Sequence, residues 1–228
     1  MSEQFLLVNE VFRSIQGEST WVGKPCTFVR LKGCPLRCRY CDTSYAFHEG
    51  HRRSIQDVID EVLDNGDSLV EVTGGEPLIH PQVHPFMKKL CDLGLQVLLE
   101  TSGERDIQVC DPRIIRIIDI KTPNSGAGGS FLYSNIDDLR QSDEIKFVII
   151  DREDFDWALQ FVQEYNLLER VHAVHFSPVM EQAGNEHIQG CDGLEPVTLA
   201  QWILESGSAV RFHLQVHKYI WPPDKRGV

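Results

Sequence analysis

The sequence predicts an α/β fold, a partial and open βα barrel with about six βα units. Strand-like apolar runs alternate with helix-like amphipathic runs along the 228 residues, with no internal repeat or linker. Such alternation implies a parallel sheet with right-handed crossovers. Since eight units close a full barrel, six leave it open, and we expect the ligand at the carboxyl ends of the strands.

The expected strands are short apolar runs bounded by polar segments. The run at 114–120 is nearly continuous isoleucine, which is typical of a strand buried on both faces. The run at 69–73 leads directly into two glycines. In chain order the expected strands are 26–31, 69–73, 95–100, 114–120, 145–150, 171–176 and 210–215.

The expected helices carry apolar residues at helical spacing. In the first of them Ile55, Val58 and Val62 share one face. Ser54 is its expected N-cap, and Gly66 lies just past its end. In chain order the expected helices are 54–63, 83–93, 135–140, 155–165 and 197–204.

Composition limits the classes of function. Hydrophobic residues make up 42% and charged residues 25%, which is ordinary for a folded domain and excludes a disordered chain. A chain of this length can bury one sizeable core, so we expect a single domain over residues 1–228. A formal net charge of −12 disfavours a nucleic-acid partner, which requires clustered lysine and arginine. A small, nucleobase-like substrate fits better.

Two observations indicate a cytoplasmic protein without a membrane partner. No apolar run approaches the roughly 18 residues of a membrane-spanning helix. The N-terminal Met1-Ser2-Glu3-Gln4 lacks the basic and apolar parts of a signal peptide. We therefore expect reduced thiols. The cysteine count is 7, which is odd, and three of these residues crowd into one short segment, which favours metal binding over disulfides.

That segment gives the strongest functional signal in the chain. Cys34, Cys38 and Cys41 form a C-x3-C-x2-C pattern in the loop after the first expected strand. Three thiolates at this spacing can bind one face of a [4Fe–4S] cluster and leave one iron open. A structural zinc site is the alternative, with His48 or His51 as a fourth ligand.

The flanking residues give the chain a resemblance to the radical S-adenosylmethionine (SAM) superfamily. Tyr40 supplies the aromatic residue that precedes the third cysteine, and Thr73-Gly74-Gly75-Glu76-Pro77 corresponds to the glycine-rich motif after the next strand. In that superfamily the amino and carboxylate groups of SAM chelate the open iron. The glycines would let the backbone approach a ligand closely, and Glu76 would accept from the SAM ammonium group.

Further motifs narrow the resemblance to the 7-carboxy-7-deazaguanine synthase family, from about residue 9 to residue 218. They lie at 12–18, 28–34, 41–43, 100–103 and 215–219. The resemblance implies a lyase of queuosine and 7-deazapurine biosynthesis. It would convert 6-carboxy-5,6,7,8-tetrahydropterin to 7-carboxy-7-deazaguanine and release ammonia. A radical formed from SAM would start the reaction, and SAM would be regenerated, so no protein residue is expected to be catalytic in its own right.

The resemblance also implies site residues. Arg30 would bind the substrate carboxylate, because its planar guanidinium suits bidentate contact. The expected substrate contacts are Ile15, Gln16, Gly17, Glu18, Arg30, Thr101 and His217. The expected SAM contacts are Tyr40, Cys41, Asp42, Gly75, Glu76, Gly103, Asp119, Ile120, Lys121, Ser177, Pro178, Val179 and Met180. Thr43 would bind a Mg²⁺ ion, with Asp42 as the alternative ligand.

The resemblance implies a homodimer and a flavodoxin-like electron donor. Two other functions stay open from the residues alone. An activase that installs a glycyl radical on a partner protein would share the cysteine loop but lack the Gln16-Gly17-Glu18 segment. A non-catalytic zinc or iron–sulfur module would have no need of the Gly-Gly-Glu turn. The role of the tail after Lys218 is not defined by the sequence.

Overall fold

The computed structural model describes residues 4–222 and 225–228. The expected absence of a signal peptide falls mainly on Met1, Ser2 and Glu3, which lie outside the described residues. The strands are β1 (Phe5–Ile15), β2 (Pro25–Leu31), β3 (His51–Ser54), β4 (Leu69–Gly74), β5 (Gln96–Thr101), β6 (Ile115–Asp119), β7 (Glu144–Ile149), β8 (Ala173–Pro178) and β9 (Arg211–Phe212). The α-helices are α1 (Ile55–Asn65), α2 (Val83–Asp92), α3 (Arg152–Glu164), α4 (Leu167–Arg170), α5 (Pro196–Ser206) and α6 (His217–Ile220).

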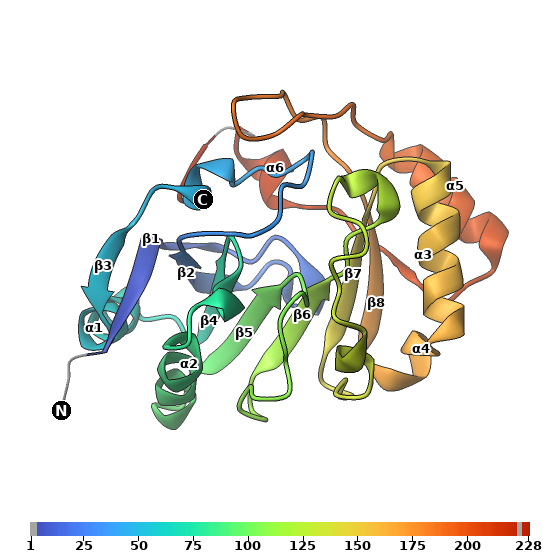
Figure 1. Ribbon diagram of the computed structural model, residues 1–228. Coiled ribbons are helices and arrows are strands. Elements are labelled where there is room, and N and C mark those ends of the chain that lie inside the picture. The colour runs from blue at the N-terminus through green and yellow to red at the C-terminus, as the bar shows by residue number, and fades with distance from the viewer. Residues whose placement is uncertain (1–3, 223–224) are drawn as a thin grey trace.

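The strands of this described part form one open, curved sheet in the order β3-β1-β2-β4-β5-β6-β7-β8-β9 (Figure 1). From β2 to β9 all neighbouring strands are parallel, whereas β1 runs antiparallel to both β2 and β3. The prediction of a mainly parallel, open sheet is confirmed. The antiparallel edge made by β1 and β3 was not predicted.

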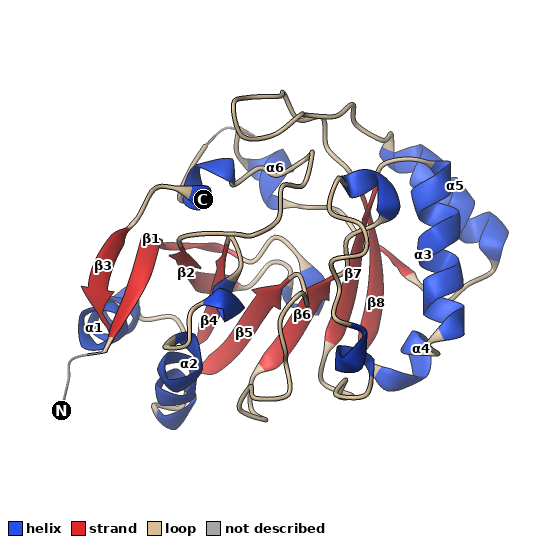
Figure 2. Ribbon diagram, viewed as in Figure 1, coloured by secondary structure: helices blue, strands red, loops and turns tan. Residues whose placement is uncertain are grey.

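Helices cover the outer face of this sheet (Figure 2). The helices α1 and α2 pack at the β1 side and α3, α4 and α5 at the β8 side. α1 begins and ends as predicted: the Ser54 hydroxyl accepts from the Asp57 backbone N–H at 3.0 Å, and Gly66 has a left-handed φ of 76°. Its buried residues join the main core between sheet and helices. No helix among the described residues is both long and apolar enough to cross a membrane.

Two expected elements differ in the structure. The helix expected at 135–140 is wrong: residues Tyr133–Ile136 form a single 3-10 turn. The reason is the fully buried Asn135, whose side chain donates to the carbonyls of Gly103 and Arg105 and so ties this segment to another loop. The final strand expected at 210–215 is reduced to Arg211–Phe212, so His217 begins α6 instead of following a strand.

On β2, β4 and β5 the inner face of the sheet changes from apolar to polar along the strand. A small apolar cluster closes one end of this face, with Phe28, Leu69 and Leu98 among its members. Towards the carboxyl ends of the same strands lie Arg30, Glu71 and Glu100, all of which line one cavity. The sheet therefore places polar side chains next to an apolar cluster, at the edge where the sequence predicted the ligand.

Candidate active site

The cavity at this edge has a volume of about 430 Å³. Its walls come from the loops after β1, β2, β4, β5 and β6, from β7, and from the segments after β8 and β9. Most residues that the sequence proposed for the site take part. The lining includes Ile15, Gln16, Gly17, Glu18, Arg30, Cys34, Cys38, Tyr40, Cys41, Asp42, Thr43, Gly75, Thr101, Asp119, Lys121, Val179, Met180 and His217.

The three cysteines of the loop after β2 all face this cavity. Arg37 braces the loop, because its Nη1 donates to the carbonyls of Cys34 and Leu36 at 2.8 and 2.7 Å. Burial raises the pKa of the Cys34 thiol to about 11 and that of the Cys41 thiol to about 12. Metal coordination is the ordinary means of stabilising such buried thiols as thiolates. All seven cysteines are free, so none of these thiols is committed to a disulfide.

The histidines considered as zinc ligands lie elsewhere. Neither His48 nor His51 is among the described residues that line the cavity. The His48 ring instead packs 4.8 Å from the ring of His187, measured between ring centroids. With neither of these histidines beside the three thiols, a [4Fe–4S] cluster with one open iron suits the described site better than the zinc site considered from the sequence.

Two glycines, Gly74 at the end of β4 and Gly75 directly after it, let the chain pack closely against the residues that lead into the cysteine loop. A Cβ atom on Gly75 would lie 2.1 Å from the Gly33 carbonyl oxygen and 2.7 Å from the Cys34 Cβ. A Cβ atom on Gly74 would lie 2.4 Å from the Leu31 carbonyl oxygen. The close approach that requires glycine is thus between two backbone segments. The sequence interpretation had assigned it to a ligand.

Glu76 has a different environment from the one expected of a SAM contact. It is fully buried and is not among the described residues that line the cavity. Its carboxylate accepts from the Thr101 hydroxyl at 2.7 Å, the Ser102 hydroxyl at 2.6 Å and the backbone N–H groups of Ser102 and Leu78 at 2.8 and 3.0 Å. Glu76 therefore fixes the end of β5, and Thr101 lines the cavity from there.

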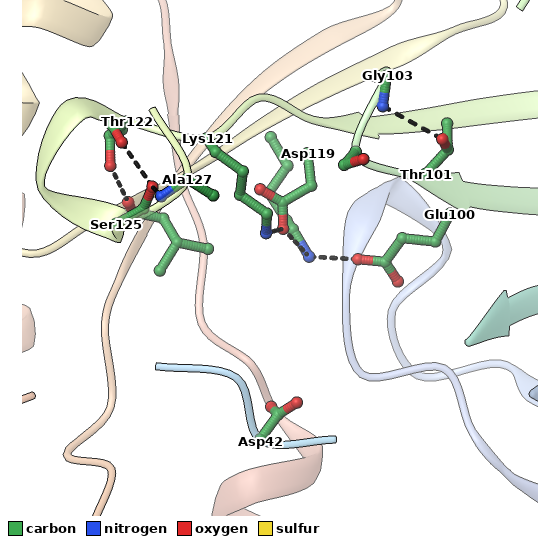
Figure 3. Close-up of polar contacts among 12 residues, drawn as sticks. Asp42, Glu100, Thr101, Gly103, Asp119, Lys121, Thr122, Ser125 and Ala127 are labelled. Atoms are coloured by element: carbon green, nitrogen blue, oxygen red, sulfur yellow. Dashed lines mark hydrogen bonds and ion pairs between the residues drawn. The ribbon is translucent and has the colours of Figure 1, made fainter. Parts of the chain in front are cut away.

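Four further expected SAM contacts, namely Gly103, Ile120, Ser177 and Pro178, are not among the described residues that line the cavity. Gly103 donates its backbone N–H to the Thr101 hydroxyl at 3.2 Å (Figure 3). Two lining residues have buried polar atoms with no partner among the described residues, the Tyr40 hydroxyl and one Asp119 carboxylate oxygen. Unsatisfied polar atoms facing a cavity fit a polar cofactor such as SAM.

A buried ion-pair cluster forms the polar floor, and sequence reasoning missed its central residue. The Lys146 ammonium lies 2.7 Å from Glu18, 2.5 Å from Glu100 and 3.3 Å from Asp119. Asp119 also pairs with Lys121 at 2.9 Å, and Figure 3 shows Asp119, Lys121 and Glu100 directed towards one another. A lysine inside the apolar run of β7 was the available sequence signal, because charges are rarely buried without a partner.

Two of the expected substrate contacts, Glu18 and Arg30, are fixed by ion pairs and hydrogen bonds to nearby residues. Burial opposes ionisation of Glu18, but the charge of Lys146 lowers the Glu18 pKa below its usual range. Gln215 adds a hydrogen bond to Glu18 at 2.9 Å. Arg30 pairs with Glu10, with 2.8 Å between its Nε and the carboxylate oxygen. Glu10 therefore restrains the Arg30 side chain, which makes Glu10 a supporting residue that the sequence did not reveal.

Asp42 and Thr43, side by side in the chain, also line the cavity. The Thr43 hydroxyl donates to the Asp42 carboxylate at 2.8 Å, and the Lys218 ammonium pairs with Asp42 at 2.7 Å. Burial opposes ionisation of Asp42, but Lys218 lowers its pKa below the usual range. A hydroxyl beside an ionised carboxylate is an oxygen donor set suited to a hard cation.

Comparison with known proteins agrees with this geometry. Residues 28–120, which span β2 to the end of β6, match the Radical SAM superfamily. A cysteine loop over an open parallel sheet and this match together define a radical SAM enzyme, whose cofactors are a [4Fe–4S] cluster and SAM.

Full-length relatives define the family more narrowly. The chain is 44% identical over 225 residues to the 7-carboxy-7-deazaguanine synthase of Koribacter versatilis, covering 97% of this chain and 99% of the relative. It is 41% identical to that of Chlorobaculum tepidum, covering 100% and 99%. QueE from Escherichia coli has the same fold, with a TM-score of 0.73 at 21% identity over 93% of this chain and 95% of that one. The chain belongs to the 7-carboxy-7-deazaguanine synthase family.

Proposed function

We propose that this cavity converts 6-carboxy-5,6,7,8-tetrahydropterin to 7-carboxy-7-deazaguanine with release of ammonia. One observation carries the proposal: the cysteine loop and the segment from Ile15 to Glu18 line the same cavity, although they come from different strands. The names of the relatives specify the product. A glycyl-radical activase would need an opening for a protein loop and has no support among these relatives.

In the proposed site Cys34, Cys38 and Cys41 hold the [4Fe–4S] cluster. When bound, the cluster and SAM supply a one-electron cleavage and a carbon radical that the protein itself does not provide. We assign Tyr40, Asp42, Asp119, Lys121, Val179 and Met180 to the SAM side, because each lines the cavity. Glu76, Gly103, Ile120, Ser177 and Pro178 would support that side from behind the lining.

On the substrate side the chain supplies position and charge. Arg30, which is paired with Glu10, would bind the substrate carboxylate. Gln16 offers both a donor and an acceptor to a pterin edge, and Thr101 and His217 add further polar contacts. Because this cavity is walled by loops from both chain ends, bound substrate would be shielded from water, which protects a radical from side reactions.

The decisive experiment is anaerobic turnover. Purified protein with a reconstituted cluster is incubated with SAM, Mg²⁺, dithionite and the carboxypterin, and the deazaguanine product is followed by mass spectrometry. Cys34→Ala, Cys38→Ala and Cys41→Ala should each lose the brown iron–sulfur absorbance and all product. Cys91→Ala is the matched control, since Cys91 lies in the main core. An active wild type without this product would refute the assignment.

We also propose that Thr43 contributes an oxygen to a Mg²⁺ ion that holds the substrate carboxylate. Its hydroxyl lies beside the ionised Asp42, and Mg²⁺ takes few protein ligands and keeps several waters. Thr43→Val removes the oxygen but keeps the shape. The valine variant should need more Mg²⁺ for half-maximal rate, and an unchanged Mg²⁺ titration would exclude Thr43 as a ligand.

The remaining proposals concern the domain organisation, the oligomeric state, the electron donor and the cellular location of the enzyme. We propose one radical SAM domain over residues 1–228, a homodimer, a flavodoxin-like reductant and a cytoplasmic location, where seven free thiols remain reduced. Sedimentation of the holoenzyme tests the dimer. Replacement of dithionite by reduced flavodoxin tests the donor, and product formation at a comparable rate would support it.

A further inference from the structure

A buried carboxylate below the cavity reaches across the sheet to the loop that follows β1. Glu144, at the start of β7, is 1% exposed. Its carboxylate accepts from the Thr20 backbone N–H at 2.9 Å and from the Thr20 hydroxyl at 2.5 Å. The His175 Nε2 atom lies 2.7 Å from the same carboxylate. Glu144 is not among the described residues that line the cavity, so it has no direct role at the substrate.

The protonation states of this cluster follow from its contacts. Burial opposes ionisation of Glu144, but the hydrogen bonds from His175 and Thr20 lower its pKa, so the carboxylate is ionised. Nε2 of His175 must then carry the proton and donate it, because an ionised carboxylate only accepts. His175 on β8 thereby sets the direction of the Glu144 side chain, and the His213 ring packs against the His175 ring with 5.1 Å between ring centroids.

The segment that Glu144 holds is the one that carries the expected substrate contacts. Residues 16–20 leave β1 and turn back towards β2, closed by a hydrogen bond from the Gly23 N–H to the Gln16 carbonyl at 2.8 Å. Within this turn Ser19 has a φ of 62°, a left-handed conformation that a residue with a Cβ rarely adopts. Such a conformation persists only when surrounding contacts determine it, and Thr20 is the next residue.

The anchoring strand is distant from the loop's own strand. In the sheet β1 and β7 are separated by β2, β4, β5 and β6. Two residues of β7 nevertheless bind the loop from the same strand face: Glu144 binds Thr20, and Lys146 pairs with Glu18 at 2.7 Å. The loop therefore crosses the inner face of the sheet near the amino ends of the parallel strands, and two residues of β7 hold it there.

We propose that Glu144, oriented by His175, is a positioning residue that holds the 16–20 loop in the conformation that binds the pterin substrate. The inference rests on the proposed function for the identity of the substrate. Its structural part, the ordering of the loop through Thr20, does not depend on that function. The two parts can therefore be tested separately.

Thr20→Val is the main test, because Thr20 is only half-buried and its loss should not prevent folding. The variant keeps the backbone N–H but loses the hydroxyl contact to a buried carboxylate, a loss that typically costs a factor of ten or more. We expect the KM for the carboxypterin to rise roughly tenfold with kcat and SAM affinity nearly unchanged. Thr20→Ser should restore the wild-type KM. Thr198→Val, the same change on α5, is the matched control.

A second measurement reports on the loop without turnover. Trp21 is adjacent to Thr20, so acrylamide quenching of its fluorescence measures the exposure of the loop. Quenching of Trp21, obtained as the difference from a Trp21→Phe background, should increase in Thr20→Val and in Glu144→Gln. If Glu144→Gln does not fold, the threonine variants decide the question.

Unchanged KM together with unchanged quenching in Thr20→Val would overturn the inference. A fall in kcat or in SAM affinity at constant KM would also overturn it, since the effect would then not be on substrate positioning. If wild type formed no deazaguanine at all, the proposed function would fail, while the quenching result would still decide whether Glu144 orders the loop.

Discussion

Among individual residues, the buried carboxyl group of Glu71 differs from its neighbours because no cation pairs with it in the described part of the chain. Four carboxyl groups, those of Glu18, Glu71, Glu100 and Asp119, line the polar floor, with Lys121 and Lys146 as the cations there. The lysines pair with the other three, whereas Glu71 accepts a hydrogen bond from Gln16 and, in the described part of the chain, has no ion-pair partner. Burial, followed by the negative charges of Glu100 and Glu18, raises the Glu71 pKa well above its ordinary value.

This environment predicts a pH-dependent effect of Glu71→Gln. The folded protein holds the Glu71 proton more tightly than the unfolded chain, so stability decreases as the pH rises above the ordinary value of 4.5 towards the raised pKa. Glutamine has the shape of the protonated acid, can accept from Gln16 and can donate to Glu100. We expect the variant to have a higher Tm than wild type at about pH 8, with a smaller difference near pH 5.

Thermal unfolding followed by circular dichroism at the two pH values measures this difference. Glu205→Gln, an exposed glutamate at the end of α5, should show no such pH dependence. A Tm difference for Glu71→Gln that stays constant with pH would mean that Glu71 is ionised in the folded protein.

Gly75 gives a second prediction at the residue scale. A methyl group there would overlap the Gly33 carbonyl at 2.1 Å and press on the Cys34 Cβ at 2.7 Å, so Gly75→Ala must separate the two backbones and displace the first cysteine. We expect lower iron and sulfide content per protein after reconstitution, measured by chemical assay. Gly207→Ala is strained by its φ of 63° but meets nothing within 4 Å, so it should keep full iron content. Equal iron loss in both variants would point to general destabilisation.

At the scale of elements, prediction from sequence succeeded where a signal is local. The helix α1 follows from its cap, its apolar spacing and its terminal glycine, and the cysteine loop follows from spacing alone. The helix expected at 135–140 failed because contacts remote in sequence hold this segment: the Asn135 side chain donates to the Gly103 carbonyl, and the Asp138 carbonyl accepts from Arg116 on β6. Strands β1 and β3 were missed because each pairs with a partner defined only by the tertiary fold.

Residues 102–114, between β5 and β6, contain no helix, and those between β6 and β7 form only 3-10 turns. In place of helices, a buried ion pair holds these two connecting segments against the sheet. Arg116 on β6 is fully buried and binds both oxygens of Asp143, the Ile107 carbonyl at 2.8 Å and the Asp138 carbonyl at 2.6 Å. Arg116 thus ties both connecting loops to the sheet.

Asp143→Asn should therefore be strongly destabilising. It keeps the shape but leaves the Arg116 guanidinium buried without its counter-charge, and breaking such a pair typically costs about 3–5 kcal/mol. Urea unfolding of the variant should show a midpoint far below that of wild type. Asp156→Asn breaks the exposed pair with Arg152 and should leave the midpoint nearly unchanged. A small effect of Asp143→Asn would show that the loops are held by the apolar core alone.

At the scale of the whole molecule, the two ends of the chain meet over the cavity. The Val216 N–H donates to the Gly17 carbonyl at 3.0 Å, and the His217 ring occupies the space where a side chain on Gly17 would lie. Closer to the C-terminus, Arg226 pairs with Glu49 at 2.8 Å, and Figure 1 marks the C-terminus beside that region. Because these contacts join segments almost 200 residues apart, the site could be predicted from motifs but not assembled from sequence.

The last residues therefore form part of the cavity wall, and their removal gives the final prediction. Residues 225–228 line the cavity but contribute nothing to the apolar core, so deleting them should leave the Tm close to that of wild type. We expect the KM for the carboxypterin to rise several-fold, because an open wall admits water to the polar contacts and weakens each of them.

The variant Arg226→Ala removes the ion pair with Glu49 but keeps the other residues of the terminal wall, so it tests the ion pair alone. The pair with Glu49 is half-exposed on both sides, and such surface pairs contribute little. This variant should therefore behave like wild type in steady-state kinetics while the deletion does not. If the deletion has the wild-type KM, substrate binding depends on the loops of residues 15–18 and 215–218 alone, and the terminal segment is not part of the binding wall.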